Sequence, residues 1–148
     1  MTRMPEESTD FTVRPYVARD RDALVDLWET VFPDDPPRNA PEILLANKLR
    51  VQPELLLIAE GPVGLVGAVI AGYDGYRGWI YHLAVRPEHR RRGIGTMLVR
   101  SAEERLRKLG CPKINLQVRA TNHAVAEFYR GLGYAVEDRI SMGRALEE

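Results

Sequence analysis

Three consecutive arginines followed by two spaced glycines form the stretch of this sequence whose residue types best suit an anion. Arg90–Arg92 precede Gly93-Ile94-Gly95, and a helical pattern begins near Thr96. A helix N-terminus leaves backbone N–H groups unpaired and carries partial positive charge. Glycine also lets a ligand approach the main chain, because no Cβ intervenes. The stretch therefore predicts a site for a pyrophosphate.

Two common phosphate-binding motifs do not match this stretch. A Walker loop requires GxxxxGK[ST], which is absent, and a Rossmann fingerprint requires three glycines where only Gly93 and Gly95 are present. A solvated charge run beside a turn would explain the arginines alone. Their position directly before a helix N-terminus favours the binding interpretation.

The elements that position the loop are a strand before it and a long helix after it. Residues 79–85 alternate in polarity as a buried strand does, and Pro87 ends the strand because proline cannot donate to a ladder. The helix after the loop has apolar residues at helical spacing, namely Met97, Leu98, Ala102, Leu106 and Leu109. Gly110 ends this helix as a C′ glycine.

The remaining chain predicts a mixed α/β order of elements. Helices are expected at 20–32, 41–51 and about 122–132, in addition to the helix after the loop. Strands are expected at 11–17, 55–60, 63–73, 79–85 and 113–119, with one or two more in 135–146. Asp74-Gly75 predicts the hairpin turn that leads into the strand at 79–85.

Composition limits the class of protein. The 148 residues predict a flexible tail at 1–10 and a single domain at 11–148. The 21 basic and 21 acidic side chains argue against a general nucleic-acid binder. Neither a signal peptide nor a membrane span is expected, and the single cysteine, Cys111, is compatible with a reducing cytoplasm. The three histidines lack metal-ligand spacing, so no metal is expected.

Two motifs resemble those of the GNAT family of N-acetyltransferases. Arg90, Gly93 and Gly95 match its acetyl-CoA motif R-x-x-G-x-G, after a strand that ends at 83–87. The stretch 115–134, NLQVRATNHAVAEFYRGLGY, is similar to its second signature. The resemblance covers nearly the full length and implies the α/β GNAT fold, a mixed central sheet of six to seven strands flanked by about four helices.

The resemblance also assigns residues to acetyl-CoA, which would be the co-substrate. The loop would bind the pyrophosphate, and 83–85 would offer backbone groups to the pantetheine arm like an added strand. The residues implied for coenzyme binding are Leu83, Ala84, Val85, Arg90, Arg91, Arg92, Gly93, Ile94, Gly95, Thr96 and Asn122. Tyr129 would be the catalytic residue that supplies an O–H to the departing thiolate.

The sequence departs from the family pattern where a base is expected. Within the family the resemblance is to the RimI-like or an uncharacterised small-acetyltransferase branch. Trp79 nevertheless stands where many members carry a glutamate, and Gln117 stands where RimI-like members, otherwise similar over 116–122, carry another. His82 is the nearby side chain of a type that titrates near neutrality. A water path, or the free-amine fraction of the acceptor, is the interpretation that we favour over His82.

The expected function is an acetyl-CoA-dependent N-acetyltransferase that moves an acetyl group by direct attack of a primary amine. The acceptor is expected to be a small-molecule or peptide amine, with no nucleic acid or membrane as partner. A non-catalytic acyl-CoA-binding regulatory module is the alternative, and a nucleic-acid-binding domain is disfavoured by the neutral net charge. Both a monomer and a homodimer stay open.

Overall fold

The computed structural model describes residues 10–146, so the predicted tail at 1–10 lies outside the described residues except for Asp10. The chain divides into two compact units, one up to Gln117 and one from Val118 onward. The prediction of a single domain over 11–148 stays a prediction.

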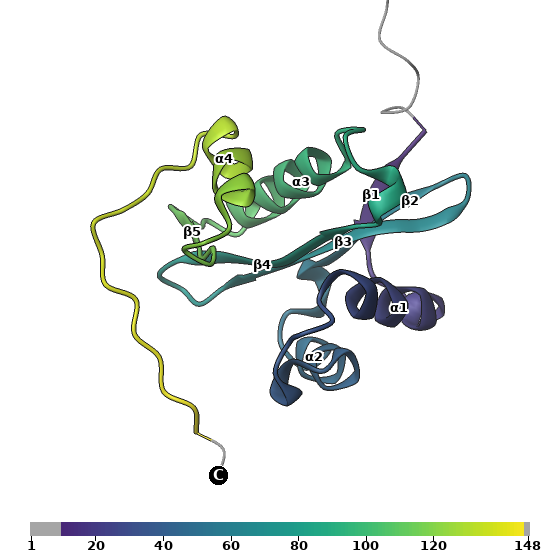
Figure 1. The fold of residues 1–148 in the computed structure, drawn as a ribbon, viewed down its shortest axis with the longest axis horizontal. Helices are drawn as coiled ribbons and strands as arrows, with labels where there is room; N and C mark the ends of the chain where they lie inside the picture. Colours follow the sequence, from purple (N-terminus) through teal and green to yellow (C-terminus); the bar gives the residue numbers. More distant parts are fainter. Residues whose placement is uncertain (1–9, 147–148) are drawn as a thin grey trace, which may run out of the picture. The chain divides into compact units, whose positions relative to one another are not determined.

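The first unit is built on a five-stranded sheet whose spatial order follows the chain order (Figure 1). Its strands are β1 (Thr12–Pro15), β2 (Leu56–Gly61), β3 (Gly64–Tyr73), β4 (Gly78–Val85) and β5 (Ile114–Leu116). The first four strands pair antiparallel, whereas β4 and β5 pair parallel. The sheet is therefore mixed, as the resemblance to the GNAT family implied.

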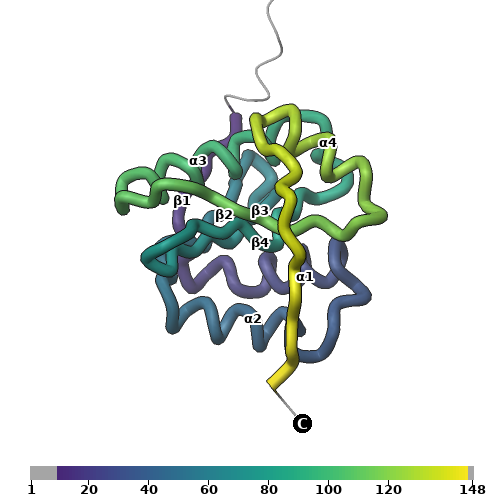
Figure 2. Tube along the Cα trace, turned by 90° about the vertical axis from the view of Figure 1, so that its left-hand side faces the viewer, coloured from purple at the N-terminus to yellow at the C-terminus, as the bar shows by residue number. Residues whose placement is uncertain are grey.

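Helices cover both faces of this sheet (Figures 1 and 2). The helices α1 (Arg21–Val31) and α2 (Pro41–Lys48) lie on one face, and α3 (Ile94–Lys108) lies on the other. The core under α1 includes Leu24, Leu27 and Trp28, all essentially inaccessible to solvent. On the opposite face Gly67 allows close packing of α3, because an added Cβ would lie 3.1 Å from a methyl carbon of Leu98.

A bulge interrupts β4 next to its partner β3. Ala84 pairs with Ala68 and Tyr81 pairs with Ile70, so His82 and Leu83 together lie opposite one β3 residue. His82 has a left-handed φ of 48°. Such a bulge redirects side chains relative to plain strand alternation.

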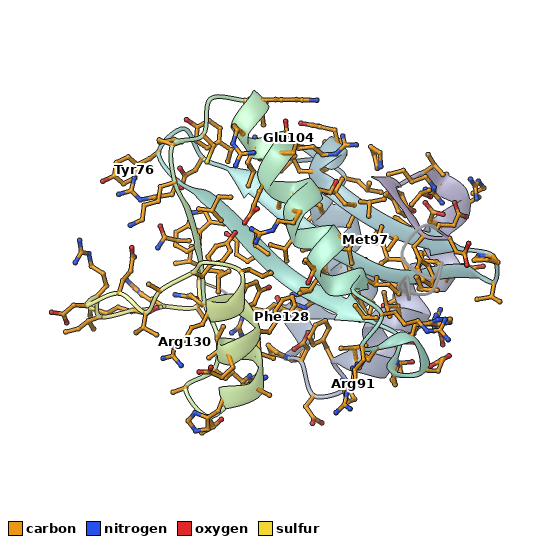
Figure 3. All side chains as sticks on the ribbon, turned by 90° about the horizontal axis from the view of Figure 1, so that it is seen from above. Tyr76, Arg91, Met97, Glu104, Phe128 and Arg130 are labelled. Carbon is orange, nitrogen blue, oxygen red and sulfur yellow. The ribbon has the colours of Figure 1, made fainter. Side chains whose placement is uncertain are left out.

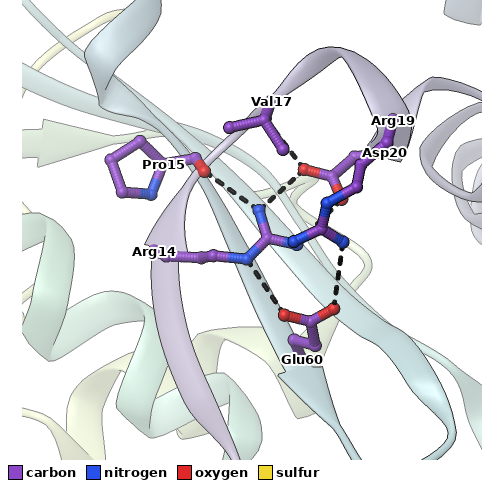
Figure 4. Close-up of polar contacts among 6 residues, drawn as sticks. All are labelled: Arg14, Pro15, Val17, Arg19, Asp20 and Glu60. Atoms are coloured by element: carbon purple, nitrogen blue, oxygen red, sulfur yellow. Dashed lines mark hydrogen bonds and ion pairs between the residues drawn. The ribbon is translucent and has the colours of Figure 1, made fainter.

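An arginine ties β1 to the start of α1 and to β2 (Figure 4). The two terminal nitrogens of Arg14 donate to the two carboxylate oxygens of Asp20, each at 2.8 Å, and its Nε donates to Glu60 at 3.0 Å. Asp20 also accepts from the Val17 N–H at 2.9 Å. The hydrogen bonds from Arg14 are the main cause that holds the pKa of Asp20 below its ordinary value.

The second unit contains α4 (His123–Gly131) and the segment after it. Asn122 is the N-cap, and its side-chain oxygen accepts from the Val125 N–H at 3.2 Å. This confirms the predicted helix start. The Tyr129 ring packs edge-on against Tyr134, with centroids 5.6 Å apart.

The final strands expected in 135–146 do not form. The segment contains no strand, and its apolar side chains Val136, Ile140 and Met142 are 75–89% exposed. Three successive charged residues, 137–139, and Gly143 disfavour a ladder there. The prediction of six to seven strands is therefore wrong for the described residues, which form five.

Two other elements end earlier than the sequence pattern suggests. β5 covers Ile114–Leu116 rather than 113–119, and α2 ends at Lys48 rather than near Val51. Within residues 10–146 no helix is both long and apolar enough to cross a membrane.

Candidate active site

The glycine-rich loop opens directly onto the N-terminus of α3. Gly93 is the N-cap residue with a φ of +81°, and no side chain caps this end of the helix. The Met97 N–H donates to the Gly93 carbonyl at 3.0 Å. The N–H groups of residues 94–96 precede that bond and so have no acceptor within the helix. Figure 3 shows Arg91 and Met97 at this end of the 15-residue helix, with Glu104 nearer its other end.

The surface of the loop is open and basic. A Cβ placed on Gly93 would have no atom within 4 Å. Arg90, Arg91 and Arg92 are all exposed, and the Arg90 Nε donates to the Val85 carbonyl at 3.3 Å. Exposed guanidinium groups beside unpaired N–H groups have the charge and donors that a pyrophosphate requires. The residues therefore fit the coenzyme's phosphates, although binding itself stays a prediction.

β4 leads into this loop with one edge that β5 leaves unpaired. The β4–β5 ladder runs from Gly78 to Ile80 of β4 and includes no residue after Ile80. On the other edge, Ala84 and Val85 still pair with β3. The edge at 83–85 consequently has the backbone geometry that an added extended segment needs.

No carboxylate occupies the position of Trp79, as the sequence already indicated. The indole Nε1 donates to Asp74 at 3.3 Å, and the ring stacks on Tyr81 with centroids 6.4 Å apart. Asp74 accepts the backbone N–H groups of Arg77 and Tyr76, which lower its pKa. An acid held ionised in this way is a weak proton acceptor.

His82 is paired with a residue that sequence reasoning missed. Its Nε2 lies 2.8 Å from Oδ2 of Asp35, in the loop after α1. The ring packs against Phe32, with centroids 4.5 Å apart, and edge-on against Trp28 at 6.1 Å. Asp35 is 47 residues away from His82 in the chain. No local pattern could have found it, because the proline-rich stretch 33–37 predicts only a loop.

A pocket of about 430 Å³ lies beside Asp35. It is lined by Glu29, Phe32, Pro33, Asp35, Pro36, Pro37, Ala40 and Pro41. Two carboxylates on a mostly apolar wall suit an organic cation, which gains both charge pairing and apolar contact. The pocket and His82 belong to the same compact unit.

Tyr129 and Asn122 belong to the second unit. Tyr129 is 7% exposed, and burial raises the pKa of its hydroxyl to about 12. Asn122 has the capping role given above, and a role in coenzyme binding stays a prediction. Phe128 and Arg130, which Figure 3 labels on α4, are the sequence neighbours of Tyr129 in this helix.

Residues 10–146 contain no group of three or more histidine, cysteine, aspartate or glutamate side chains placed to hold a metal ion. The single thiol, of Cys111, donates to the Lys113 carbonyl at 3.3 Å.

A mixed sheet whose fourth strand leads into a basic, glycine-opened helix N-terminus defines an α/β protein suited to a phosphorylated ligand. A family model described as "Acetyltransferase (GNAT) family" matches residues 21–134, and the chain belongs to this family. The resemblance deduced from the two motifs is thereby confirmed. The RimI-like branch within the family stays a prediction.

Curated relatives place the chain among enzymes. An acetyltransferase of Yersinia enterocolitica is 40% identical over 134 residues, which cover 90% of this chain and 94% of the relative. An acetyltransferase of Pectobacterium atrosepticum is 41% identical over 136 residues, covering 92% and 96%. The chain is therefore an N-acetyltransferase, and nothing in these relatives supports the regulatory-module alternative.

Solved structures share the fold. The PaiA N-acetyltransferase of Thermoplasma acidophilum, solved in complex with coenzyme A, superposes with a TM-score of 0.75 at 22% identity, covering 88% of this chain and 92% of that one. The aminoglycoside N-acetyltransferase AAC(6')-Iy, solved with a bisubstrate analogue, gives a TM-score of 0.77 at 16% identity, covering 91% and 97%. At these identities the likeness establishes the GNAT fold.

Proposed function

We propose that this enzyme transfers the acetyl group of acetyl-CoA to a primary amine by direct attack of the amine nitrogen on the thioester carbon. The observation that carries the proposal is the uncapped N-terminus of α3, with Gly93 at φ +81° and exposed arginines beside it. In an acetyltransferase such a site is suited to the pyrophosphate of the acyl donor.

The binding residues follow from this placement of the pyrophosphate. Arg90–Arg92 and the N–H groups of 93–96 would hold the phosphates, and the edge at 83–85 would pair with the pantetheine arm. Asn122 would contact the coenzyme in addition to capping α4. Acetyl-CoA supplies the activated acyl group. The CoA complex of the PaiA neighbour supports this assignment by likeness of fold.

Tyr129 would stabilise the departing sulfur. With a pKa of about 12, its phenol stays protonated throughout the working pH range. A thiol loses its proton at roughly 8.5, so the thiolate is the weaker base of the two. The hydroxyl therefore acts best as a hydrogen-bond donor to the thiolate, which is protonated on its way to solvent.

The acceptor would be a small-molecule or peptide amine. Alkyl amines have pKa values near ~10 and α-amino groups near ~8, so the attacking nitrogen must lose a proton first. Direct attack requires no enzyme nucleophile. The neighbour AAC(6')-Iy was solved with an analogue that joins CoA to an acetylneamine, which is consistent with an amine acceptor in this fold.

The test is thiol release from acetyl-CoA in the presence of an amine library of peptide N-termini, lysine, polyamines and aminoglycosides. Acceptor-dependent free thiol together with an acetylated amine by mass spectrometry is the expected result. A folded protein that binds CoA but acetylates none of these amines would overturn the proposal.

A further inference from the structure

We propose that His82 accepts the proton of the acceptor amine and that Asp35 is the positioning residue that orients its ring. The proposal rests on the acetyl transfer proposed above. It replaces the water path favoured from sequence, because the sequence placed no partner beside His82.

The bulge in β4 is what brings the two residues together. His82 has a left-handed φ of 48°, and its ring reaches the loop after α1, where Nε2 lies 2.8 Å from Asp35. Left-handed backbone is unfavourable for a residue other than glycine and persists only where the surroundings impose it. The two side chains are 18% and 19% exposed, so the pair is partly shielded from water.

The pairing fixes the tautomer of the neutral imidazole. An ionised carboxylate only accepts hydrogen bonds, so Nε2 must carry the hydrogen that points at Asp35. The lone pair then lies on Nδ1. Within residues 10–146, Nδ1 of His82 has no hydrogen-bond partner. It is also the ring nitrogen nearer to Cβ and hence to β4. This division of roles between ring nitrogens is that of a histidine base oriented by an acid.

His82 contacts Asp35, a residue that lines the pocket, and directly precedes the proposed thioester edge in β4. Asp35 lines the pocket of about 430 Å³, and Leu83, the neighbour of His82, begins the edge proposed for the pantetheine arm. An amine held by the carboxylates of the pocket would thus lie on the side of the sheet to which the ring extends.

Other charged groups near the ring are accounted for by their contacts. On α1, Glu29 lines the pocket, and the ring of Trp28, which packs against His82, is uncharged, as is the ring of Phe32 directly after α1. On β4, burial raises the pKa of Tyr81, which keeps that phenol neutral. The Arg86 guanidinium donates to Asp26 at 2.9 Å and so forms a separate ion pair. Asp35 is therefore the charge that acts on the ring directly.

The proposed transfer forms one C–N bond and breaks one C–S bond. The neutral amine nitrogen forms a bond to the acetyl carbon, and one proton of that nitrogen passes to Nδ1 of His82. The C–S bond breaks, and its electron pair leaves with sulfur as the thiolate, which takes one proton from solvent. His82 then releases its proton to solvent. The net reaction converts an amine and acetyl-CoA into an amide and free CoA.

Kinetics test the proposal through His82→Gln and Asp35→Asn, with His123→Gln and Asp34→Asn as matched controls on exposed residues. The profile of kcat/KM against pH is measured with two acceptors whose amines differ in pKa by about two units. The acid limb is the part of this profile in which kcat/KM falls as the pH is lowered. If the acceptor amine causes the limb, its pH position differs between the two acceptors, whereas a limb caused by an enzyme group stays at the same pH. We expect a fixed acid limb in the parent, its absence in His82→Gln together with a loss of about 10²-fold in kcat/KM, and a smaller loss of kcat/KM in Asp35→Asn.

Nuclear magnetic resonance supplies a readout that does not depend on turnover. The chain has three histidines, so the imidazole nitrogens can be assigned from His82→Gln and His123→Gln. We expect His82 in the ligand-free protein to carry hydrogen on Nε2 and the lone pair on Nδ1, and we expect this preference to weaken in Asp35→Asn. A hydrogen on Nδ1 would overturn the proposal, as would a fixed acid limb that persists in folded His82→Gln.

The two proposals can fail separately. If the parent acetylates amines, and His82→Gln and Asp35→Asn change neither the acid limb nor kcat/KM, the proposed acetyl transfer is supported and the proposed role of His82 is wrong. If His82 has the expected tautomer but the parent acetylates no amine, the proposed function falls, and the role of His82 as a proton acceptor falls with it.

Discussion

Gly93 and Gly110 lie at opposite ends of α3 and share a left-handed backbone, with φ of +81° and +85°. At neither position would a Cβ meet another atom within 4 Å. A β-branched residue at either position therefore costs backbone strain of about 1–2 kcal/mol without a clash inside the protein. The two glycines differ in that only Gly93 lies at the proposed pyrophosphate site.

This difference gives the first prediction. Gly93→Val should weaken CoA binding by more than tenfold, because the side chain occupies the space through which the pyrophosphate approaches the main chain. Gly110→Val should lower the melting temperature as much as Gly93→Val does, but it should leave the affinity for CoA unchanged. Isothermal calorimetry on both folded variants measures their dissociation constants for CoA. Equal CoA affinities of Gly93→Val and Gly110→Val would mean that the loop is not part of the binding site.

Arg90→Gln should weaken CoA binding by roughly tenfold and reduce its dependence on salt, because one charge-assisted hydrogen bond to phosphate is lost. Arg107→Gln is the matched control, since it removes the same charge from an exposed arginine that pairs with Glu104. Titrations at low and high ionic strength distinguish the two. A similar loss in both variants would indicate a general charge effect.

Tyr129→Phe should lower kcat by about 10²-fold while the CoA dissociation constant stays nearly the same, because the hydroxyl acts on the departing sulfur and not on the bound ground state. Tyr134→Phe, which alters the ring packed edge-on against Tyr129, controls for packing. Pre-steady-state thiol release isolates the chemical step. A Tyr129→Phe enzyme as fast as its parent in that step would assign the residue to packing alone.

Asp20→Asn should reduce the free energy of unfolding at pH 7 by about 2 kcal/mol, because Asp20 accepts two hydrogen bonds from Arg14. In a protein of this size that corresponds to roughly 5 °C in melting temperature. The folded-state pKa of Asp20 lies below its ordinary value. The stabilisation by Asp20 is therefore complete above the pKa of its carboxyl in the unfolded chain, which is about 4. It is lost as the pH falls through the lower pKa of the folded state.

The difference between the parent and Asp20→Asn should accordingly shrink below about pH 4. Asp22→Asn is the control, because the Asp22 side chain is 99% exposed. Denaturant titrations between pH 2 and pH 7 measure both differences. If the difference in unfolding free energy between the parent and Asp20→Asn stays constant over this pH range, the carboxylate charge contributes nothing to stability.

Local periodicity predicted most elements of the fold because helices and strands repeat over short intervals. The helix expected at 20–32 forms as Arg21–Val31, and the strand expected at 63–73 forms as Gly64–Tyr73. The helix expected at about 122–132 forms as His123–Gly131, with Asn122 as its N-cap. In these cases apolar spacing and capping chemistry act within a few residues, so the sequence alone contains the necessary information.

The loop from Arg90 to Gly95 could be predicted from sequence for the same reason. Its charge and its glycines, and the helix that follows it, are adjacent in the chain. The segment at 135–146 could not, since a strand depends on a partner strand that local alternation does not specify. Its apolar residues alternate in part, yet they remain exposed.

The pairing of His82 with Asp35 was decided only by the tertiary structure. Plain alternation assigns His82 a face of β4, but the bulge opposite β3 redirects the ring toward a loop 47 residues away. A bulge arises from the register between two strands, and an ion pair between distant segments arises from how a helix packs on a sheet. Neither is encoded in the order of neighbouring residues, which is why the sequence specified the glycine-rich loop at 90–95 and left the candidate base without its partner.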